Sequence, residues 1–182
     1  MLSFVIWEVS AVTVSRQSVS PYAGSIGHEK ISQKELLMTL RYYDLLSRTQ
    51  TNSKEAVSSK PLSADQLQAL AWQAIVLSRE AKHQGIQVSD AEVREEVERL
   101  FSIGTGFNEP FYQNWIRTNF RGQPRDFEEV ARKQIAVQKI RQKVLEGIPE
   151  KDRDARWLQW LGPVLSRAKI HTYSPEKSET ND

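Results

Sequence analysis

The stretch that most constrains the fold runs from residue 67 to residue 99. In its first half, small and apolar residues recur at steps of three and four, which predicts one apolar stripe along a helix of about five turns. Gly85 is expected to end this helix as a left-handed cap. Ser89 and Glu92 then form a capping-box pattern, so a second, charged helix follows a tight corner. The stripe comprises Leu67, Leu70, Ala71, Ala74, Ile75, Ser78 and Ala81.

Composition limits the alternatives. A chain of 182 residues with 39% apolar residues and a mean hydropathy of -0.54 fits one soluble domain, or one domain with appendages. Glycine is scarce and helix-forming residues dominate, which favours an all-α body. The absence of cysteine excludes disulfides and thiolate chemistry. The net charge of +2 is small for a generic nucleic-acid binder, so no nucleic-acid partner is expected.

Helix signals continue on both sides of the central stretch. Ser32 and Ser63 open capping-box patterns, Asn108 can cap a short helix, and Pro124 suits the first turn of a helix running to about residue 146. A last helical piece follows Asp154, and Gly162-Pro163 is expected to break or kink it. Together these signals predict a mainly α fold of about six helices around a long central helix.

The two ends of the domain read as short strands. Residues 24–31 form a strand pattern with a turn at Gly27-His28, and residues 168–173 alternate, so a short two-stranded pairing is expected to tie the termini together. The domain is then 24–173, with a core at 24–146 and a returning helix and strand at 154–173. Residues 48–62 read as a polar, solvent-exposed excursion, and 174–182 as a disordered tail.

Residues 1–23 are read as an arm or linker outside this domain. Residues 1–14 are apolar but shorter than the roughly 20 residues that span a bilayer, and they lack a basic n-region. They are the end of a truncated membrane anchor, a β-rich arm or a poorly ordered leader, and the sequence leaves these three interpretations open.

No pattern of catalytic or metal-ligating residues emerges. The three histidines, at positions 28, 83 and 171, lie far apart and share no ligand spacing. Glutamates at 92, 95 and 96 share a helical face, but Arg94 with Glu98 and Glu95 with Arg99 are spaced to form ion pairs, so a solvated face is expected. Gly104-Thr105-Gly106 follows no strand and is not a phosphate loop. We predict no catalytic residues, no metal and no cofactor.

Aromatic residues are dense between positions 101 and 127, where seven rings occur within 27 residues. One interpretation is that they pack the small helices onto the central one. The other is that part of the set lines an adaptable apolar groove for another polypeptide. On the second interpretation, the candidate residues that contact a bound chain are Phe101, Ile103, Phe107, Phe111, Tyr112, Trp115 and Phe120.

Three segments taken together resemble a known family. They are LQALAWQAIVLSREAKHQGIQVSDAEVREEVERLF, FNEPFYQNWIRTNF and DFEEVARKQIAVQKIRQKV, preceded by an opening IGHEKIS at Ile26–Ser32. In order and spacing they are similar to the N-terminal chaperone domain of SurA-type periplasmic folding factors, with related domains in membrane-anchored parvulin-like foldases and, more remotely, in trigger factor. The resemblance covers roughly residues 24–146. It implies binding of unfolded or partly folded chains without turnover.

The chain departs from that family in one respect. A parvulin isomerase domain usually follows the last helix of the chaperone domain, and here only residues 147–154 precede the tryptophan-rich segment 157–161. A domain of about 90–100 residues cannot occupy such a gap. We therefore expect a chaperone core with its returning helix and no isomerase insert.

These observations lead to one functional expectation and its rivals. The lead is an ATP-independent, non-enzymatic chaperone-like domain that binds unfolded or extended polypeptides outside the cytoplasm, in the periplasm or at the outer face of the inner membrane, with anchoring through the N-terminus as one route to that compartment. The alternatives are a peptidyl-prolyl isomerase-family protein that retains activity and a dedicated docking module for one partner. Each is distinguishable by assay: proline-peptide isomerisation for the first, a single saturable partner for the second.

Overall fold

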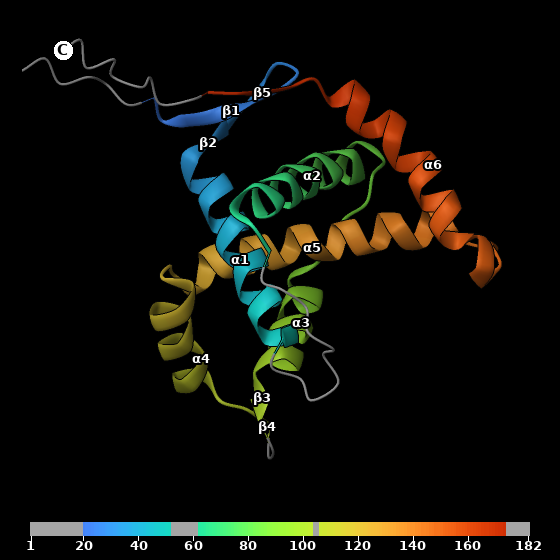
Figure 1. Cartoon of the computed structure of the whole chain (residues 1–182). Helices are drawn as coiled ribbons and strands as arrows, with labels where there is room; N and C mark the ends of the chain where they lie inside the picture. Colours follow the sequence, from blue (N-terminus) through green and yellow to red (C-terminus); the bar gives the residue numbers. More distant parts are fainter. Residues whose placement is uncertain (1–19, 52–61, 104–105, 174–182) are drawn as a thin grey trace, which may run out of the picture.

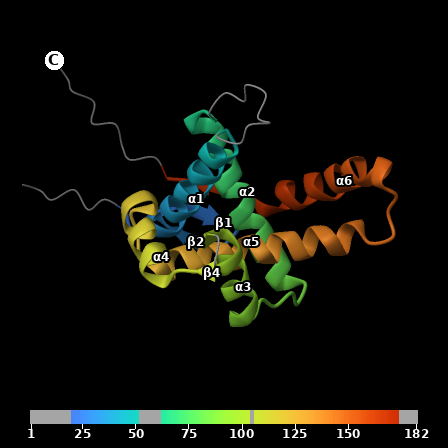
Figure 2. The ribbon, with the colours of Figure 1, turned by 90° about the horizontal axis from the view of Figure 1, so that it is seen from below.

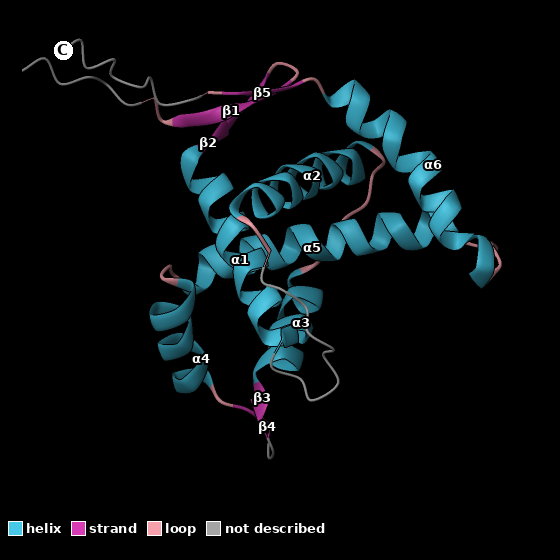
Figure 3. Ribbon diagram, viewed as in Figure 1, coloured by secondary structure: helices cyan, strands magenta, loops and turns pink. Residues whose placement is uncertain are grey.

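The computed structural model describes residues 20–51, 62–103 and 106–173 (Figure 1). The predictions made for residues 1–19, 52–61 and 174–182 lie outside the described residues. Residues 48–51, which were expected in the polar excursion, instead belong to the helix Gln33–Thr51. The described part of the chain is mainly helical, with short strands at two places (Figure 3). The elements in chain order are β1 (Tyr22–Ile26), β2 (Glu29–Ser32), α1 (Gln33–Thr51), α2 (Ala64–His83), α3 (Asp90–Phe101), β3 (Ser102–Ile103), β4 (Gly106–Phe107), α4 (Glu109–Trp115), a π-helical turn η1 (Ile116–Phe120), α5 (Pro124–Leu145), α6 (Glu150–Ala168) and β5 (Ile170–Thr172).

Helix α2 is the centre of the molecule, as its apolar stripe predicts. It crosses α5 and α1 and lies beneath the sheet, with α6 to one side (Figure 1). The predicted stripe is only one of its buried faces. Val76 and Leu77 pack against α6, and Trp72 packs under the sheet with Ile31. Because α1, α5, α6 and the sheet all cover α2, it is buried around most of its circumference between Ala71 and Leu77.

The predicted helix ends around α2 are confirmed. At its start, the Ser63 side chain caps the backbone N–H of Gln66, whose side-chain oxygen in turn accepts from the Ser63 N–H at 2.9 Å. At its end, Gly85 has a φ of +73°, and the N–H of Ile86 donates back to the Ala81 carbonyl at 2.9 Å. These bonds satisfy backbone groups that a helix terminus leaves unpaired. The Ser89 capping box that opens α3 is also formed.

The first and last strands of the described part meet in a small antiparallel sheet of order β2-β1-β5, with the predicted turn at Gly27-His28 between β1 and β2. The expected pairing of the two ends is present, since Gly24 faces Thr172 and Ile26 faces Ile170. The sheet has three strands rather than two, because residues 24–31 fold into a hairpin whose second strand joins the sheet. A Cβ on Gly24 would lie 2.2 Å from the His171 carbonyl oxygen, so only glycine fits between β1 and β5.

Helix α6 runs back along α5 and leads the chain into β5 (Figure 2). The prediction that Gly162-Pro163 would break or kink this helix is wrong as to a break, because α6 continues to Ala168, and a kink there stays a prediction. Pro163 has no backbone N–H, so one carbonyl of the preceding helical turn has no donor within the helix. Gly162 and Pro163 are both exposed, so water can bind that carbonyl. Gly162 also lacks the Cβ that would clash with the following proline ring in a helical conformation.

Candidate functional site

The aromatic residues singled out from the sequence gather in one cluster below α2. The cluster is enclosed by α1, α3, α4, η1 and α5. Phe127 lies at its centre, with ring centroids of Phe101 and Phe120 at 5.6 and 5.3 Å in edge-to-face contact. Tyr112 packs against Phe101 at 4.9 Å. Such contacts between rings stabilise a core by more than the burial of their apolar area alone.

The seven candidate contact residues do not share one environment. Phe101, Tyr112 and Phe120 are buried and pack the core, whereas Phe107 and Trp115 are half-buried and Phe111 is 40% exposed. Ile103 lies in β3, and its side chain is outside the described residues. The structure therefore brings most of the predicted set together but gives the buried rings the packing role. Direct contact of any of them with a bound chain stays a prediction.

The π-helical turn η1 places one ring of the set, that of Phe120, in the aromatic core. Ile116 and Phe120, at its two ends, are both fully buried, and the Asn119 side chain donates to the Trp115 carbonyl oxygen at 3.1 Å. The turn then ends at Arg121, which has a left-handed φ of 54°. A wider turn shifts the helical register by about one residue. No residue pattern in the sequence indicated a π-helical turn at this point.

A cleft of about 500 Å³ opens beside this cluster, between α3, the β4–α4 segment and α5. Its floor is apolar and consists of Val93, Val97, Phe107 and Tyr112. Three of these side chains are at most 5% exposed, so the floor is the outer layer of a packed core and keeps its shape. Its rim is charged, and the charged side chains are Asp90, Arg94, Glu98, Glu109, Glu128 and Arg132.

One hydrogen bond joins the floor of this cleft to its rim. The hydroxyl of Tyr112 donates to Glu128 Oε1 at 3.2 Å. Burial, followed by the nearby Glu128 charge, raises the pKa of Tyr112 above its ordinary value. The phenol therefore stays neutral at physiological pH and serves as a hydrogen-bond donor that orients the Glu128 carboxylate.

The ion pairs of α3 differ from those predicted. Neither Arg94–Glu98 nor Glu95–Arg99 forms among the described residues. Arg99 instead makes two bonds to Glu96, at 2.8 and 2.7 Å. A further α3 carboxylate, that of Glu92, reaches Lys139 of α5 at 2.5 Å, so α3 forms ion pairs both within itself and with α5.

A second polar cluster, which sequence reasoning missed, ties α1 to α2 and α5. Glu35 accepts two hydrogen bonds from Arg79, at 2.8 and 3.1 Å, and one from Lys133 at 2.6 Å. Burial alone would raise the pKa of Glu35, but the bonds from Arg79 and Lys133 lower it below its ordinary value. Only half of the predicted capping box at Ser32 therefore forms: the Ser32 hydroxyl caps the Glu35 N–H at 3.0 Å, while the Glu35 carboxylate points to the other helices.

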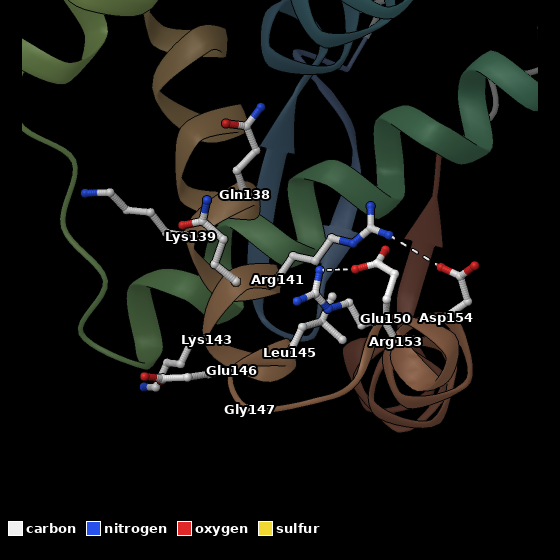
Figure 4. Close-up of a pocket in the computed structure, with 11 residues that line it drawn as sticks. Gln138, Lys139, Arg141, Lys143, Leu145, Glu146, Gly147, Glu150, Arg153 and Asp154 are labelled. Atoms are coloured by element: carbon white, nitrogen blue, oxygen red, sulfur yellow. Dashed lines mark hydrogen bonds and ion pairs between the residues drawn. The ribbon is translucent and has the colours of Figure 1, made fainter.

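Two further hollows have different chemistry. A groove of about 820 Å³ between the end of α5 and the start of α6 is lined by charged and amide side chains, with an Arg141–Asp154 pair at 3.7 Å (Figure 4). Leu145 is the one large apolar side chain in its lining, so this groove offers little to an apolar chain. A groove of about 740 Å³ between α1 and β5 is lined in part by Leu36, Leu37 and Tyr173.

Other classes of site find little support. Within residues 20–51, 62–103 and 106–173, no three histidine, aspartate or glutamate side chains are placed to hold a metal ion. No helix in the same ranges combines the length and apolar character needed to cross a bilayer.

These features define a class of protein: a helical domain whose first and last described strands pair in a small sheet and whose aromatic core borders an open cleft. A family model of the SurA-like N-terminal domain matches residues 1–141, more than half of the chain. The chain therefore belongs to the SurA-like N-terminal domain family, as its sequence motifs indicated. No curated protein and no solved structure matches it significantly.

Proposed function

We propose that this protein is a chaperone-like domain that holds unfolded or extended polypeptide segments without chemical turnover. The observation that carries the proposal is the cleft between α3, α4 and α5, in a chain of the SurA-like family. A concave apolar surface with a few polar groups at its rim is the usual form of a binding site. Partial burial of one or two client side chains gives weak and reversible binding, since ordering the client offsets much of the gain.

The half-buried ring of Phe107 provides the test. It lies on the floor of the cleft with its centroid 5.7 Å from that of Tyr112. Phe107→Ala should weaken binding of an unfolded outer-membrane protein about tenfold, because a client side chain loses its largest apolar contact. The measurements are suppression of client aggregation and fluorescence anisotropy of a labelled client peptide, with circular dichroism confirming the fold.

Leu158→Ala is the matched control, since Leu158 is 65% exposed on α6, away from the cleft. It should leave client binding and the fold unchanged. Unchanged binding in a folded Phe107→Ala variant would show that the cleft is not the site.

A dedicated docking module is the second candidate, and the groove between α1 and β5 favours it. Leu37 and Tyr173, which line this groove, are 44% and 43% exposed, and Ile170 of the adjoining strand is 37% exposed. If Leu37→Ala abolishes capture of one saturable partner while aggregation of unrelated clients is unaffected by the wild-type chain, the docking function replaces the chaperone function.

We further propose that the domain acts outside the cytoplasm and carries no isomerase activity. Family membership supports the location, and residues 146–149 are all that joins α5 to α6, which leaves no room for an isomerase domain at that point. Cell fractionation and a proline-peptide isomerisation assay test the two statements separately. Anchoring through the N-terminal residues is tested by washing membranes with alkaline carbonate, which releases proteins that are not inserted.

A further inference from the structure

The rim of the cleft carries carboxylates that form no ion pair with any lysine or arginine in the described part of the chain. Glu98 of α3, Glu109 of α4 and Glu128 of α5 all line the cleft. Glu109 accepts a hydrogen bond from the Gln113 amide at 2.7 Å, and Glu128 accepts one from the Tyr112 hydroxyl. In the described part of the chain, no lysine or arginine nitrogen lies within 4.0 Å of any of the three.

The cations of the same cleft do not balance this charge. Arg132 is already engaged, with one guanidinium nitrogen 2.7 Å from Asp90 Oδ1 and another 2.7 Å from the Val88 carbonyl oxygen. Arg94 is the other guanidinium of the lining, so two arginines face four carboxylates, those of Asp90, Glu98, Glu109 and Glu128. The cleft is therefore acidic although the whole chain has a net charge of +2, so its charge does not simply follow the composition.

The occupant of such a cleft must satisfy two kinds of surface. The floor of Val93, Val97 and Phe107 accepts apolar atoms, and the rim above it accepts hydrogen bonds from a cation. Lysine and arginine combine an apolar stem with a cationic head, and they commonly lay the stem on an apolar surface while the head stays at the polar edge. A segment with glutamate or aspartate at the same position would bring like charges together.

We infer that the cleft selects extended client segments in which lysine or arginine stands beside apolar residues. This inference rests on the proposed function and adds the class of client segment to it. Electrostatic complementarity of this kind acts mainly on selectivity and on the rate of association, and it weakens as salt is added.

The test uses the full chain and three short labelled peptides with identical alternating apolar residues, in which the intervening residues are lysine, glutamine or glutamate. Solvent-exposed ion pairs contribute little individually, so the lysine peptide should bind about fivefold more tightly than the glutamine peptide at low salt, and the glutamate peptide more weakly than either. The differences should shrink when salt is raised.

Glu98 and Glu95 supply matched variants. Both lie on α3, and neither has an ion-pair partner within 4.0 Å among the described residues, but only Glu98 lines the cleft. Glu98→Lys should remove or reverse the preference for the lysine peptide, whereas Glu95→Lys should keep it.

Each outcome has one reading. Equal affinity for the three peptides, with Phe107→Ala still weakening all of them, overturns the charge preference and leaves the proposed function standing. Equal loss of preference in both lysine variants also overturns it, because the effect then comes from net charge and not from the cleft. No binding of any peptide, together with no suppression of client aggregation, overturns the proposed function as well.

Discussion

The cluster around Glu35 gives the sharpest prediction about stability. Its carboxylate binds Arg79 from α2 and Lys133 from α5, and the three side chains are 17%, 16% and 25% exposed. Glu35→Gln keeps the size of the side chain and removes its charge. Two cations that are largely shielded from water then lose their shared counter-charge.

The expected cost follows from that burial. Removing one partner of a fully buried ion pair costs about 3–5 kcal/mol, and exposed pairs contribute about 0–1 kcal/mol. This cluster lies between the two limits, and Arg79 keeps a second carboxylate, that of Glu29, at 3.1 Å. We therefore expect Glu35→Gln to lower the free energy of unfolding by about 2 kcal/mol at pH 7.

The pH dependence distinguishes charge from shape. The pKa of Glu35 is lowered in the folded state from an ordinary value of 4.5, so the cluster stabilises the fold fully above that pH. The stabilisation is lost as the pH falls through the lower, folded-state pKa, where the wild-type carboxyl becomes protonated and resembles glutamine. The difference between wild type and Glu35→Gln should therefore approach zero in acid.

Urea unfolding followed by circular dichroism, at pH 7 and at an acidic pH below the folded-state pKa of Glu35, measures this difference. Glu129→Gln is the control, because Glu129 is exposed on α5 beside the same cluster and has no ion pair among the described residues. The control should change stability by less than about 0.5 kcal/mol at both pH values. An equal cost of Glu35→Gln at pH 7 and in acid would refute the electrostatic account.

Three further predictions concern packing and backbone, and urea unfolding checks each. Phe120→Ala should cost about 3–5 kcal/mol because this ring is fully buried, whereas Phe111→Ala, at a ring 40% exposed, should cost less than about 1 kcal/mol. Gly24→Ala should cost about 2 kcal/mol and speed hydrogen exchange in β5, because the new Cβ would lie 2.2 Å from a β5 carbonyl oxygen. Ser89→Ala should cost about 1 kcal/mol through loss of the α3 cap, and no change in stability would contradict the capping geometry.

The parts of the fold that the sequence predicted are those that local interactions decide. The caps at Ser63 and Ser89, the left-handed Gly85 and the turn at Gly27-His28 each depend on residues within one helical turn or one tight turn. The same local reading failed at Glu35. Its carboxylate binds Arg79 and Lys133, which lie 44 and 98 positions further along the sequence. No local pattern indicates partners at such distances.

The candidate site was predicted only in part, for a related reason. Ring density between positions 101 and 127 located the aromatic cluster, but burial of a given ring depends on the turn η1 and on how α3 and α4 meet α5. Periodicity assigns a helix one apolar face, whereas α2 has neighbours on several sides and buries Trp72, Val76 and Leu77 in addition to its stripe. Tertiary contacts therefore decided which rings border the cleft.

The structure also determines which substitutions can report on binding. The cleft floor and the core cluster share Val93, Val97 and Tyr112. Truncating any of these side chains would loosen the packing of α3 and α4 and would also weaken contact with a bound chain. Loss of binding in such variants would follow from either function or stability. Glu98 at the rim and the half-buried Phe107 do not carry the core in this way, so a binding defect in their folded variants reflects the cleft itself. If the proposed selectivity lies at the rim, substitutions there should change the preference for client segments while the packed floor keeps the fold intact.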